Sequence, residues 1–157
     1  MHLQHLFCIF LLTLGKIYPV IILTKTIIKD FALITLGGVT YMAIELIWRQ
    51  RTHWTMALTG GVCFLIIYKI YTRFPYMSLP LKCIIGSLVI SALELIVGLI
   101  VNIGLGWGVW DYSNMPLNLF GQVCLMYSVL WGLICIPISG LCRLINGLSN
   151  KKINLSV

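Results

Sequence analysis

Four nearly continuous apolar stretches dominate the pattern along the chain. They cover approximately residues 31–48, 54–71, 81–104 and 117–141. Each stretch is close to the ~20 apolar residues that an α-helix needs to cross a bilayer. The pattern therefore predicts an all-α membrane bundle with four core transmembrane helices. We place these helices in a membrane domain over residues 31–145, followed by a tail over residues 146–157.

Residues 1–30 are more ambiguous than the rest of the chain. The apolar run Leu3–Leu14 is only 12 residues long, which is too short to span a bilayer as a helix. Lys16 and Pro19 interrupt the sequence that follows. A signal peptide would need a basic start and a small-residue cleavage site, and neither is obvious. We expect this amino-terminal segment to be either an interfacial helix or an extra span.

The composition also indicates a membrane protein. The 157 residues are 60% hydrophobic and 10% charged, with a mean hydropathy of +1.01, whereas about 25% of the residues in a soluble domain are charged. The net charge of +7 does not indicate nucleic acid, because the basic residues lie at the ends of apolar runs and suit lipid headgroups. The six cysteines form no CxxC pair, and we find no phosphate-binding loop, so we predict no metal and no cofactor.

The positions of the basic residues predict an orientation in the membrane. If there are four spans, one side carries Lys16, Lys25, Lys29, Lys69, Arg73, Lys82, Arg143, Lys151 and Lys152. The opposite side carries Arg49 and Arg51, which Asp111 offsets in part. Positively charged loops stay in the cytoplasm, so we expect the carboxyl terminus to be cytoplasmic and residues 105–116 to lie outside.

Glu45, Arg49, His53 and Glu94 form the first candidate site. Glu45, Arg49 and His53 are four residues apart, so they would share one face of a continuous helix. Glu45 and Glu94 each lie about 14 residues, or ~20 Å, from the start of their predicted helices. Two carboxylates at matching depth would repel unless one is protonated or a cation intervenes, and Arg49 is the natural partner of Glu45. The cluster is either a structural ion pair that locks helix packing or a site that binds a polar substrate or relays protons.

A second candidate site lies in the aromatic, glycine-rich stretch between the third and fourth runs. Its residues are Trp107, Trp110, Asp111, Tyr112, Ser113, Asn114, Pro116 and Asn118. Trp54, at the start of the second run, and Gln122, in the fourth, are further candidate site residues. Trp and Tyr favour the headgroup region, so the stretch is either an aromatic belt or lid, or a loop that faces substrate. Asp111 could pair with Arg49 or Arg51, and Asn118 and Gln122 could form interhelical hydrogen bonds.

A short internal repeat suggests that the four spans form two tandem hairpins. Residues 43–47, AIELI, match residues 92–96, ALELI, so that Glu45 meets Glu94. In the second helix of each pair, Gly60-Gly61-Val62-Cys63 matches Gly121-Gln122-Val123-Cys124. Both hairpins would start on the same side, which predicts a parallel repeat about an axis along the membrane normal.

A longer set of residues resembles a known family. The set comprises Gly37-Gly38-x-x-Tyr41-x-x-Ile44-Glu45-x-x-Trp48-Arg49, Thr52-His53-Trp54-Thr55-Met56, Gly60-Gly61, Leu93-Glu94, Gly98, Val101-Asn102, Trp110-Asp111-Tyr112-Ser113, Pro116, Asn118 and Gly121-Gln122. This pattern is similar to that of the small bacterial membrane proteins of the Putative ABC-transporter type IV family, some of which are named ABC transporter permeases. Gln50 departs from the small residue, usually Gly, that the family has after the Trp-Arg pair.

The resemblance implies a permease that works with a separate ATPase in the bacterial cytoplasmic (inner) membrane. The chain itself contains no ATP-binding motif. We therefore expect a transport component with membrane lipid around it, and with homo-oligomers or a larger membrane or ATPase partner to complete a path. A non-transporting assembly or regulatory protein is the first alternative. An intramembrane enzyme that acts on a lipid-linked substrate, with Glu45 or Asp111 as base and His53 as acid, is a weaker one.

Overall fold

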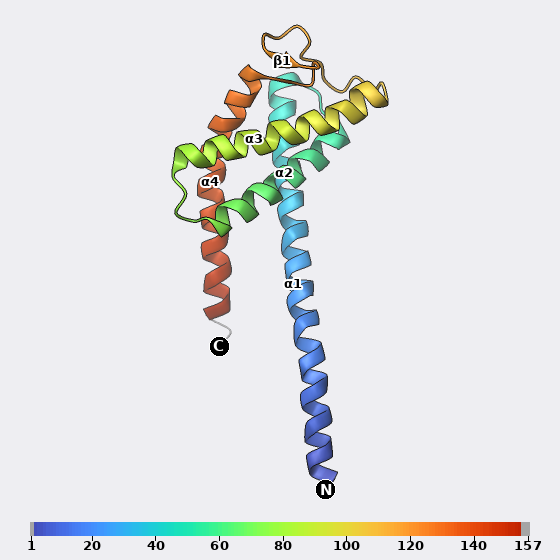
Figure 1. Ribbon diagram of the computed structural model, residues 1–157, viewed down its shortest axis with the longest axis vertical. Coiled ribbons are helices and arrows are strands. Elements are labelled where there is room, and N and C mark those ends of the chain that lie inside the picture. The colour runs from blue at the N-terminus through green and yellow to red at the C-terminus, as the bar shows by residue number, and fades with distance from the viewer. Residues whose placement is uncertain (1, 155–157) are drawn as a thin grey trace. The chain divides into compact units, whose positions relative to one another are not determined.

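We analysed a computed structural model of the chain, which describes the backbone of residues 2–154 and the side chains of residues 23–148. The elements, in chain order, are α1 (His2–Arg49), α2 (Trp54–Arg73), α3 (Leu79–Gly98), the π-helical η1 (Leu99–Gly104), β1 (Asn118–Leu119), β2 (Val123–Cys124) and α4 (Leu125–Asn154) (Figure 1). Four helical stretches within residues 23–148 are long and apolar enough to cross a membrane, which confirms the predicted fold class.

The chain divides into two compact units, Met1–Leu33 and Ile34–Val157. The first unit consists of the amino-terminal part of α1. The side chains of residues 1–22 lie outside the described residues, so the choice between an interfacial helix and an extra span stays a prediction. The second unit holds the rest of α1 and every later element, and both candidate sites belong to it. The predicted tail is helical as far as Asn154, and residues 155–157 lie outside the described part.

Small residues bring α1 and α2 together. A Cβ atom added to Gly38 would lie 2.6 Å from the carbonyl oxygen of Ala57. One added to Gly61 would lie 2.5 Å from the carbonyl oxygen of Ile34. Small residues allow helix backbones to approach closely in a membrane, where dispersion forces and hydrogen bonds replace the hydrophobic effect. The two helices therefore cross at the Gly-Gly pairs of both sequences.

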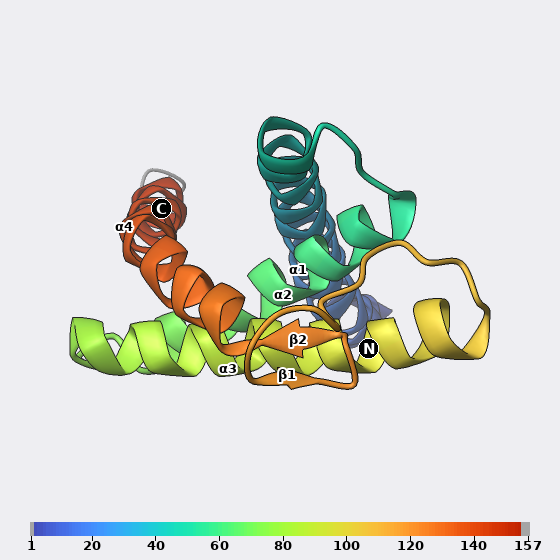
Figure 2. The ribbon, with the colours of Figure 1, turned by 90° about the horizontal axis from the view of Figure 1, so that it is seen from above.

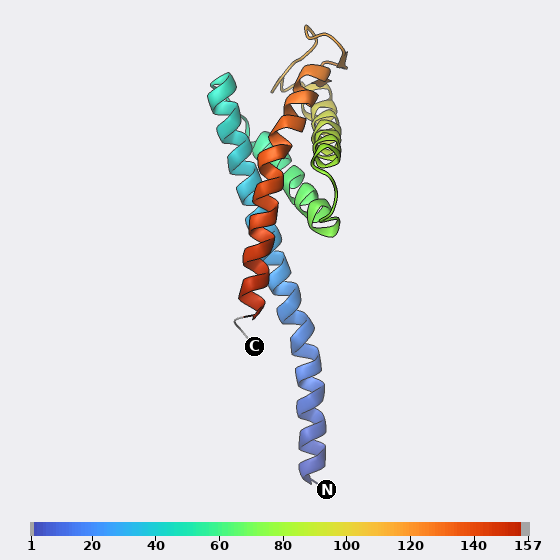
Figure 3. The same ribbon diagram turned by 90° about the vertical axis from the view of Figure 1, so that its left-hand side faces the viewer.

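Hydroxyl groups and small residues join α3 to α4. Ser87 donates a hydrogen bond of 2.5 Å to the carbonyl oxygen of Ser128, and the hydroxyls of Ser91 and Ser128 are 2.8 Å apart. Figures 2 and 3 show α4 beginning beside α3, next to the β1–β2 hairpin. On the α2 side, Tyr71 donates to the carbonyl oxygen of Lys82 at 2.5 Å, which joins α2 to the first turn of α3.

The fourth helix begins later than the sequence pattern predicts. We expected a span over residues 117–141, but α4 begins at Leu125 and the residues before it form the β1–β2 hairpin. Leu117 and Phe120 have φ values of 53°, and Gly121 has 68°, so the backbone there is left-handed and cannot continue a right-handed helix.

The hairpin also bears on the internal repeat. Gly60–Cys63 lies inside α2, whereas the matching residues 121–124 belong to the turn and strand before α4. The second half of the sequence match therefore falls on unlike structures, and duplication stays a prediction.

Candidate functional site

Three helices converge on the side chain of Glu94. This residue projects from α3 and is only 2% exposed. The hydroxyl of Tyr41 on α1 donates to its Oε1 at 2.6 Å, and the indole N–H of Trp131 on α4 donates to its Oε2 at 2.8 Å. The rings of Tyr41 and Trp131 also stack on each other, with centroids 5.4 Å apart. One carboxylate therefore holds two aromatic side chains from two other helices.

The two partners of Glu94 among the described side chains are both neutral. A buried carboxylate needs hydrogen bonds, and its charge remains expensive inside a membrane unless a proton or a cation offsets it. Tyr41 and Trp131 satisfy the oxygen atoms but supply no positive charge. The site can therefore bind a proton, or it can favour a cation nearby.

Glu45 lies one helical turn beyond Tyr41 and has a cation of its own. It is 6% exposed, and it forms an ion pair with Arg49, the partner that the sequence predicts. Thr52, in the connection to α2, donates to the other carboxylate oxygen at 3.0 Å. The carboxylate of Glu45 therefore has a charged partner and a second hydrogen-bond donor. Glu94 has no charged hydrogen-bond partner among the described side chains.

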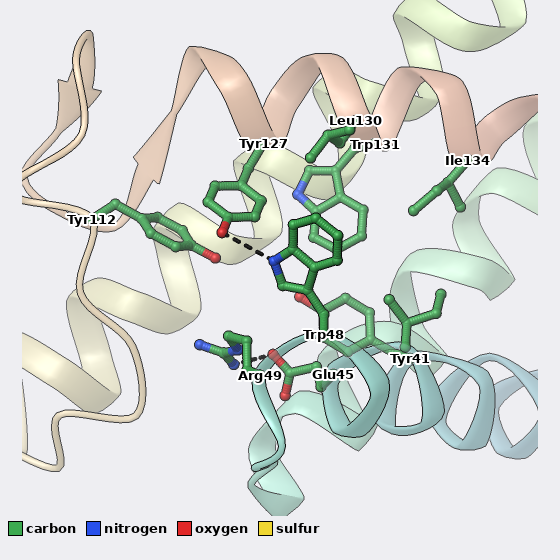
Figure 4. A pocket seen from close by; sticks show the side chains of 10 residues that line it. Tyr41, Glu45, Trp48, Arg49, Tyr112, Tyr127, Leu130, Trp131 and Ile134 are labelled. Atoms are coloured by element: carbon green, nitrogen blue, oxygen red, sulfur yellow. Dashed lines mark hydrogen bonds and ion pairs between the residues drawn. The ribbon is translucent and has the colours of Figure 1, made fainter.

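A cavity of about 140 Å³ lies beside the Glu45–Arg49 pair (Figure 4). It is here called the polar chamber after that pair, although most of the surface that lines it is apolar. Five aromatic side chains line it together with the pair: Tyr41, Trp48, Tyr112, Tyr127 and Trp131. Trp48 donates to the hydroxyl of Tyr127 at 3.3 Å, and the rings of Tyr112 and Tyr127 stack with centroids 4.6 Å apart. The chamber is therefore walled by α1, α4 and the loop before the hairpin.

A second cavity of about 470 Å³, here called the apolar cavity, adjoins the polar chamber. Tyr41, Ile44, Trp131 and Ile134 belong to the walls of both. The rest of its wall is almost entirely apolar and reaches Leu141 on α4. The charged Glu45–Arg49 pair thus lies at one of two neighbouring spaces, and the other is lined almost entirely by apolar side chains.

Sequence reasoning missed Tyr41, Trp48, Tyr127 and Trp131 as site residues. A signal was available, because Tyr41, Glu45 and Trp48 follow a spacing of four and three residues, which places them on one helical face. Tyr127 and Trp131 are likewise four residues apart on α4. Helical spacing of aromatic residues around an intramembrane carboxylate would have identified them.

His53 lies on a different element from Glu45 and Arg49. The helix α1 ends at Arg49, and Gln50 adopts a φ of 57°, so the predicted continuous face stops there. His53 instead caps the amino terminus of α2, with its Nδ1 atom 3.4 Å from the backbone nitrogen of Thr55. Its ring contacts Trp54 and Trp107, each at 5.6 Å between centroids. His53 and Trp54 therefore form an aromatic cluster at the start of α2.

Most of the predicted loop residues hold the loop itself together. The indole of the buried Trp110 donates to the carbonyl oxygen of Gln122 at 2.9 Å, and the Gln122 side chain accepts from Asn102 at 2.7 Å. Asn118 donates to the carbonyl oxygen of Met115 at 2.8 Å and accepts from the backbone of Gly121 at 3.0 Å. These bonds fix a left-handed turn and attach it to the end of the third span.

Asp111 and Tyr112 are neighbours in the chain with different environments. Asp111 is exposed and accepts from the backbone N–H of Ser113 at 2.8 Å, and this bond, with one from the Ser113 hydroxyl, lowers the pKa of the carboxyl. Tyr112 lines the polar chamber. Burial, and then the negative charge of Glu94, raise the pKa of Tyr112 well above its ordinary value. Of the predicted loop residues, Tyr112 is thus the one that the structure brings to the chamber within its described part.

The family model described as Putative ABC-transporter type IV matches residues 6–154. Neither the curated proteins nor the solved structures contain a match to the chain.

Proposed function

Because the chain belongs to the Putative ABC-transporter type IV family, we propose that it is the membrane-embedded permease component of a transporter. In this proposal the polar chamber and Glu94 form its intramembrane site, near the extracytoplasmic surface. Arg49 borders the chamber and lies at the carboxyl-terminal end of α1. Lys25 and Lys29, which the positive-inside rule assigns to the cytoplasm, precede it by at least 20 residues in the same helix.

Glu94 is the observation that carries this proposal. It is 2% exposed, lies in the third span, and has neutral hydrogen-bond donors from two other helices. A structural role in packing could be filled by an apolar side chain at lower cost, since an ionisable group within a membrane is expensive. A buried carboxylate beside a cavity is the arrangement expected where a proton or a charged group is bound and released.

The size of the protein supports a partner. The four candidate spans within residues 23–148 enclose a small space, and the polar chamber of about 140 Å³ is below the ~300 Å³ at which ligand pockets usually begin. A complete path would therefore need a second copy of the chain or a larger membrane or ATPase subunit. We place this assembly in the bacterial cytoplasmic membrane, as the family resemblance and the charge pattern suggest.

Glu94→Gln is the test of the proposed site. The amide keeps the volume of the side chain and one acceptor oxygen but cannot ionise. Cells that carry the wild-type chain are compared with cells that lack it, by untargeted mass spectrometry of the cell and medium fractions. We expect at least one solute to be redistributed by the wild type and not by Glu94→Gln, with equal amounts of both proteins inserted in the membrane.

Ser87→Ala is the matched control for that experiment. Ser87 also lies on α3 and donates to the backbone of α4, so its loss removes a polar helix contact without removing a charge. We expect this variant to redistribute the same solute as the wild type. If Glu94→Gln also retains redistribution, or if no solute depends on the wild-type chain, the permease proposal fails.

A structural role through helix packing is the second candidate function, and the Glu45–Arg49 pair favours it. This pair is closed on itself and on Thr52, as a pair that fixes the end of α1 would be. If packing is its whole role, exchanging the charges in the double variant Glu45→Arg and Arg49→Glu should restore part of the thermal stability that either single change removes. Restored stability without restored solute redistribution would separate the two roles of the pair.

A further inference from the structure

Half of the ten residues that line the polar chamber are aromatic. Five rings, from Tyr41, Trp48, Tyr112, Tyr127 and Trp131, line a space of about 140 Å³ (Figure 4). The faces of aromatic rings carry partial negative charge and attract ammonium groups, most strongly where water is excluded. The chamber, with a volume of about 140 Å³, is large enough for a methylated ammonium group.

The charges around the chamber also leave room for a cation. Glu45 and Arg49 offset each other. Glu94 adds a second carboxylate, bonded to Tyr41 and Trp131 in the chamber wall, and its described partners are neutral. Ionised Glu94 therefore gives the chamber a negative balance that a bound cation would correct. An anion would add to this negative balance, because the positive charge of Arg49 is already offset by Glu45.

The apolar cavity supplies the second half of a binding site. It shares Tyr41, Ile44, Trp131 and Ile134 with the chamber as lining, so displacement of the Tyr41 or Trp131 ring would join the two spaces. Its volume is about 470 Å³. Its lining includes Ile67, Ile90 and Ile138 from three helices. A space of this size and lining suits one alkyl chain, and a polar solute would find few partners there.

We infer that the site takes a single-chain amphiphile with a cationic ammonium head. The ammonium lies among the aromatic rings of the polar chamber, where the charge of Glu94 balances it, and the alkyl chain lies in the apolar cavity. This inference rests on the proposed function, because it names the substrate class of that same site.

The test measures binding of radiolabelled hexadecyltrimethylammonium, at low mole fraction, to the full chain in phosphatidylcholine nanodiscs, with empty nanodiscs subtracted. Competitors with the same alkyl chain carry a sulfate or a hydroxyl head, and tetramethylammonium supplies the head alone. We expect saturable binding of one probe per chain that unlabelled hexadecyltrimethylammonium displaces. Hexadecyl sulfate and hexadecanol should compete at least tenfold more weakly. Non-saturable binding, or stronger competition by the sulfate, would overturn the inference.

Two substitutions examine the two halves of the site separately. Tyr112→Ala removes one ring of the chamber and should weaken binding about tenfold, as expected for a desolvated cation–π contact. Ile138→Trp fills part of the apolar cavity and should weaken binding of the hexadecyl probe while leaving a butyltrimethylammonium probe unaffected. Leu133→Trp places the same ring on a 56% exposed position of α4 and should change neither. Unchanged hexadecyl binding by Ile138→Trp would remove the alkyl chain from that cavity.

The outcome is separable from that of the proposed function. If the cationic probe does not bind but Glu94→Gln still abolishes solute redistribution in cells, the permease proposal stands and the amphiphile inference falls. If the probe binds as expected and Glu94→Gln leaves redistribution intact, the amphiphile is a ligand of a protein that does not transport through this site, and the permease proposal falls.

Discussion

Removal of a single hydroxyl group should reveal how much Glu94 depends on its donors. In Tyr41→Phe the ring remains, and with it the stacking on Trp131, but the hydrogen bond of 2.6 Å to Oε1 is lost. The oxygen atom that loses its donor belongs to a side chain that is 2% exposed, so water cannot replace the hydroxyl without opening the bundle. Hydrogen bonds to charged groups contribute about 1.5–3 kcal/mol, and a buried acceptor left without a partner costs a similar amount.

We therefore expect Tyr41→Phe to lower the free energy of unfolding by about 1.5–3 kcal/mol. For a chain of this size each 1 kcal/mol shifts the Tm by roughly 2–4 °C, so the expected loss is about 3–12 °C. Thermal unfolding in a mild detergent, followed by tryptophan fluorescence, measures the shift. Tyr127→Phe is the matched control, because it loses a longer bond of 3.3 Å to Trp48 on the chamber wall, and its loss should stay below about 1 kcal/mol.

A double-mutant cycle decides whether the cost belongs to Glu94. In a Glu94→Gln background the acceptor is neutral, so Tyr41→Phe should cost at least about 1 kcal/mol less than in the wild type. If Tyr41→Phe lies within about 0.5 kcal/mol of wild type, or if the two changes are additive, the hydroxyl does not stabilise this carboxylate. The three helices would then meet at Glu94 through packing that does not depend on the charge of its carboxylate.

Three further predictions concern the ends and crossings of the helices. Gln50→Gly should raise the free energy of unfolding by about 0.5–1 kcal/mol, because Gln50 has a φ of 57° and glycine adopts this region without strain; a Tm below that of the wild type would contradict this. Gly61→Ala should cost about 1–3 kcal/mol, since the new Cβ atom would lie 2.5 Å from a backbone oxygen of α1, whereas Gly140→Ala, which meets open space, should not destabilise. The lowered pKa of Asp111 means that its bond to Ser113 stabilises the turn above the ordinary pKa of 3.8 and is lost as the pH falls toward the lowered value. On acidification the wild type should therefore lose Tm faster than Asp111→Ala, and parallel curves would refute this role.

The membrane helices could be predicted from the sequence because their signal is local. Apolar runs of about the right length give spans directly, and α2 begins at Trp54, where the second run does. The pairing of Glu45 with Arg49 is also local, since residues four apart share a helical face.

The start of α4 could not be predicted in this way. Hydropathy measures the cost of transferring a side chain out of water, and residues 117–124 are apolar enough to pass that test. Their backbone is instead set by left-handed residues such as Leu117 and by the hydrogen bonds of Asn118. These features depend on backbone dihedral angles, which hydropathy does not describe.

The partners of Glu94 are the other part that sequence reasoning did not find. Tyr41 precedes it by 53 residues and Trp131 follows it by 37, so no periodicity within one helix relates them. The sequence indicated that a charged carboxylate at this depth costs free energy. Only the tertiary structure identifies the hydrogen-bond donors that stabilise it. His53 illustrates the opposite error, since a regular spacing suggested a shared face that the turn at Gln50 removes.

Tyr41 and Trp131 serve two purposes at once, as hydrogen-bond donors to Glu94 and as the boundary common to both cavities. Swinging either ring aside to connect the two spaces would also strip an oxygen of its donor. By thermodynamic linkage, a proton or cation that neutralises the Glu94 oxygen must lower the free-energy cost of opening the boundary. Opening the boundary must in turn raise the affinity of Glu94 for a proton or cation. In this protein the opening between the two cavities and the ionisation of Glu94 are therefore coupled in a single equilibrium.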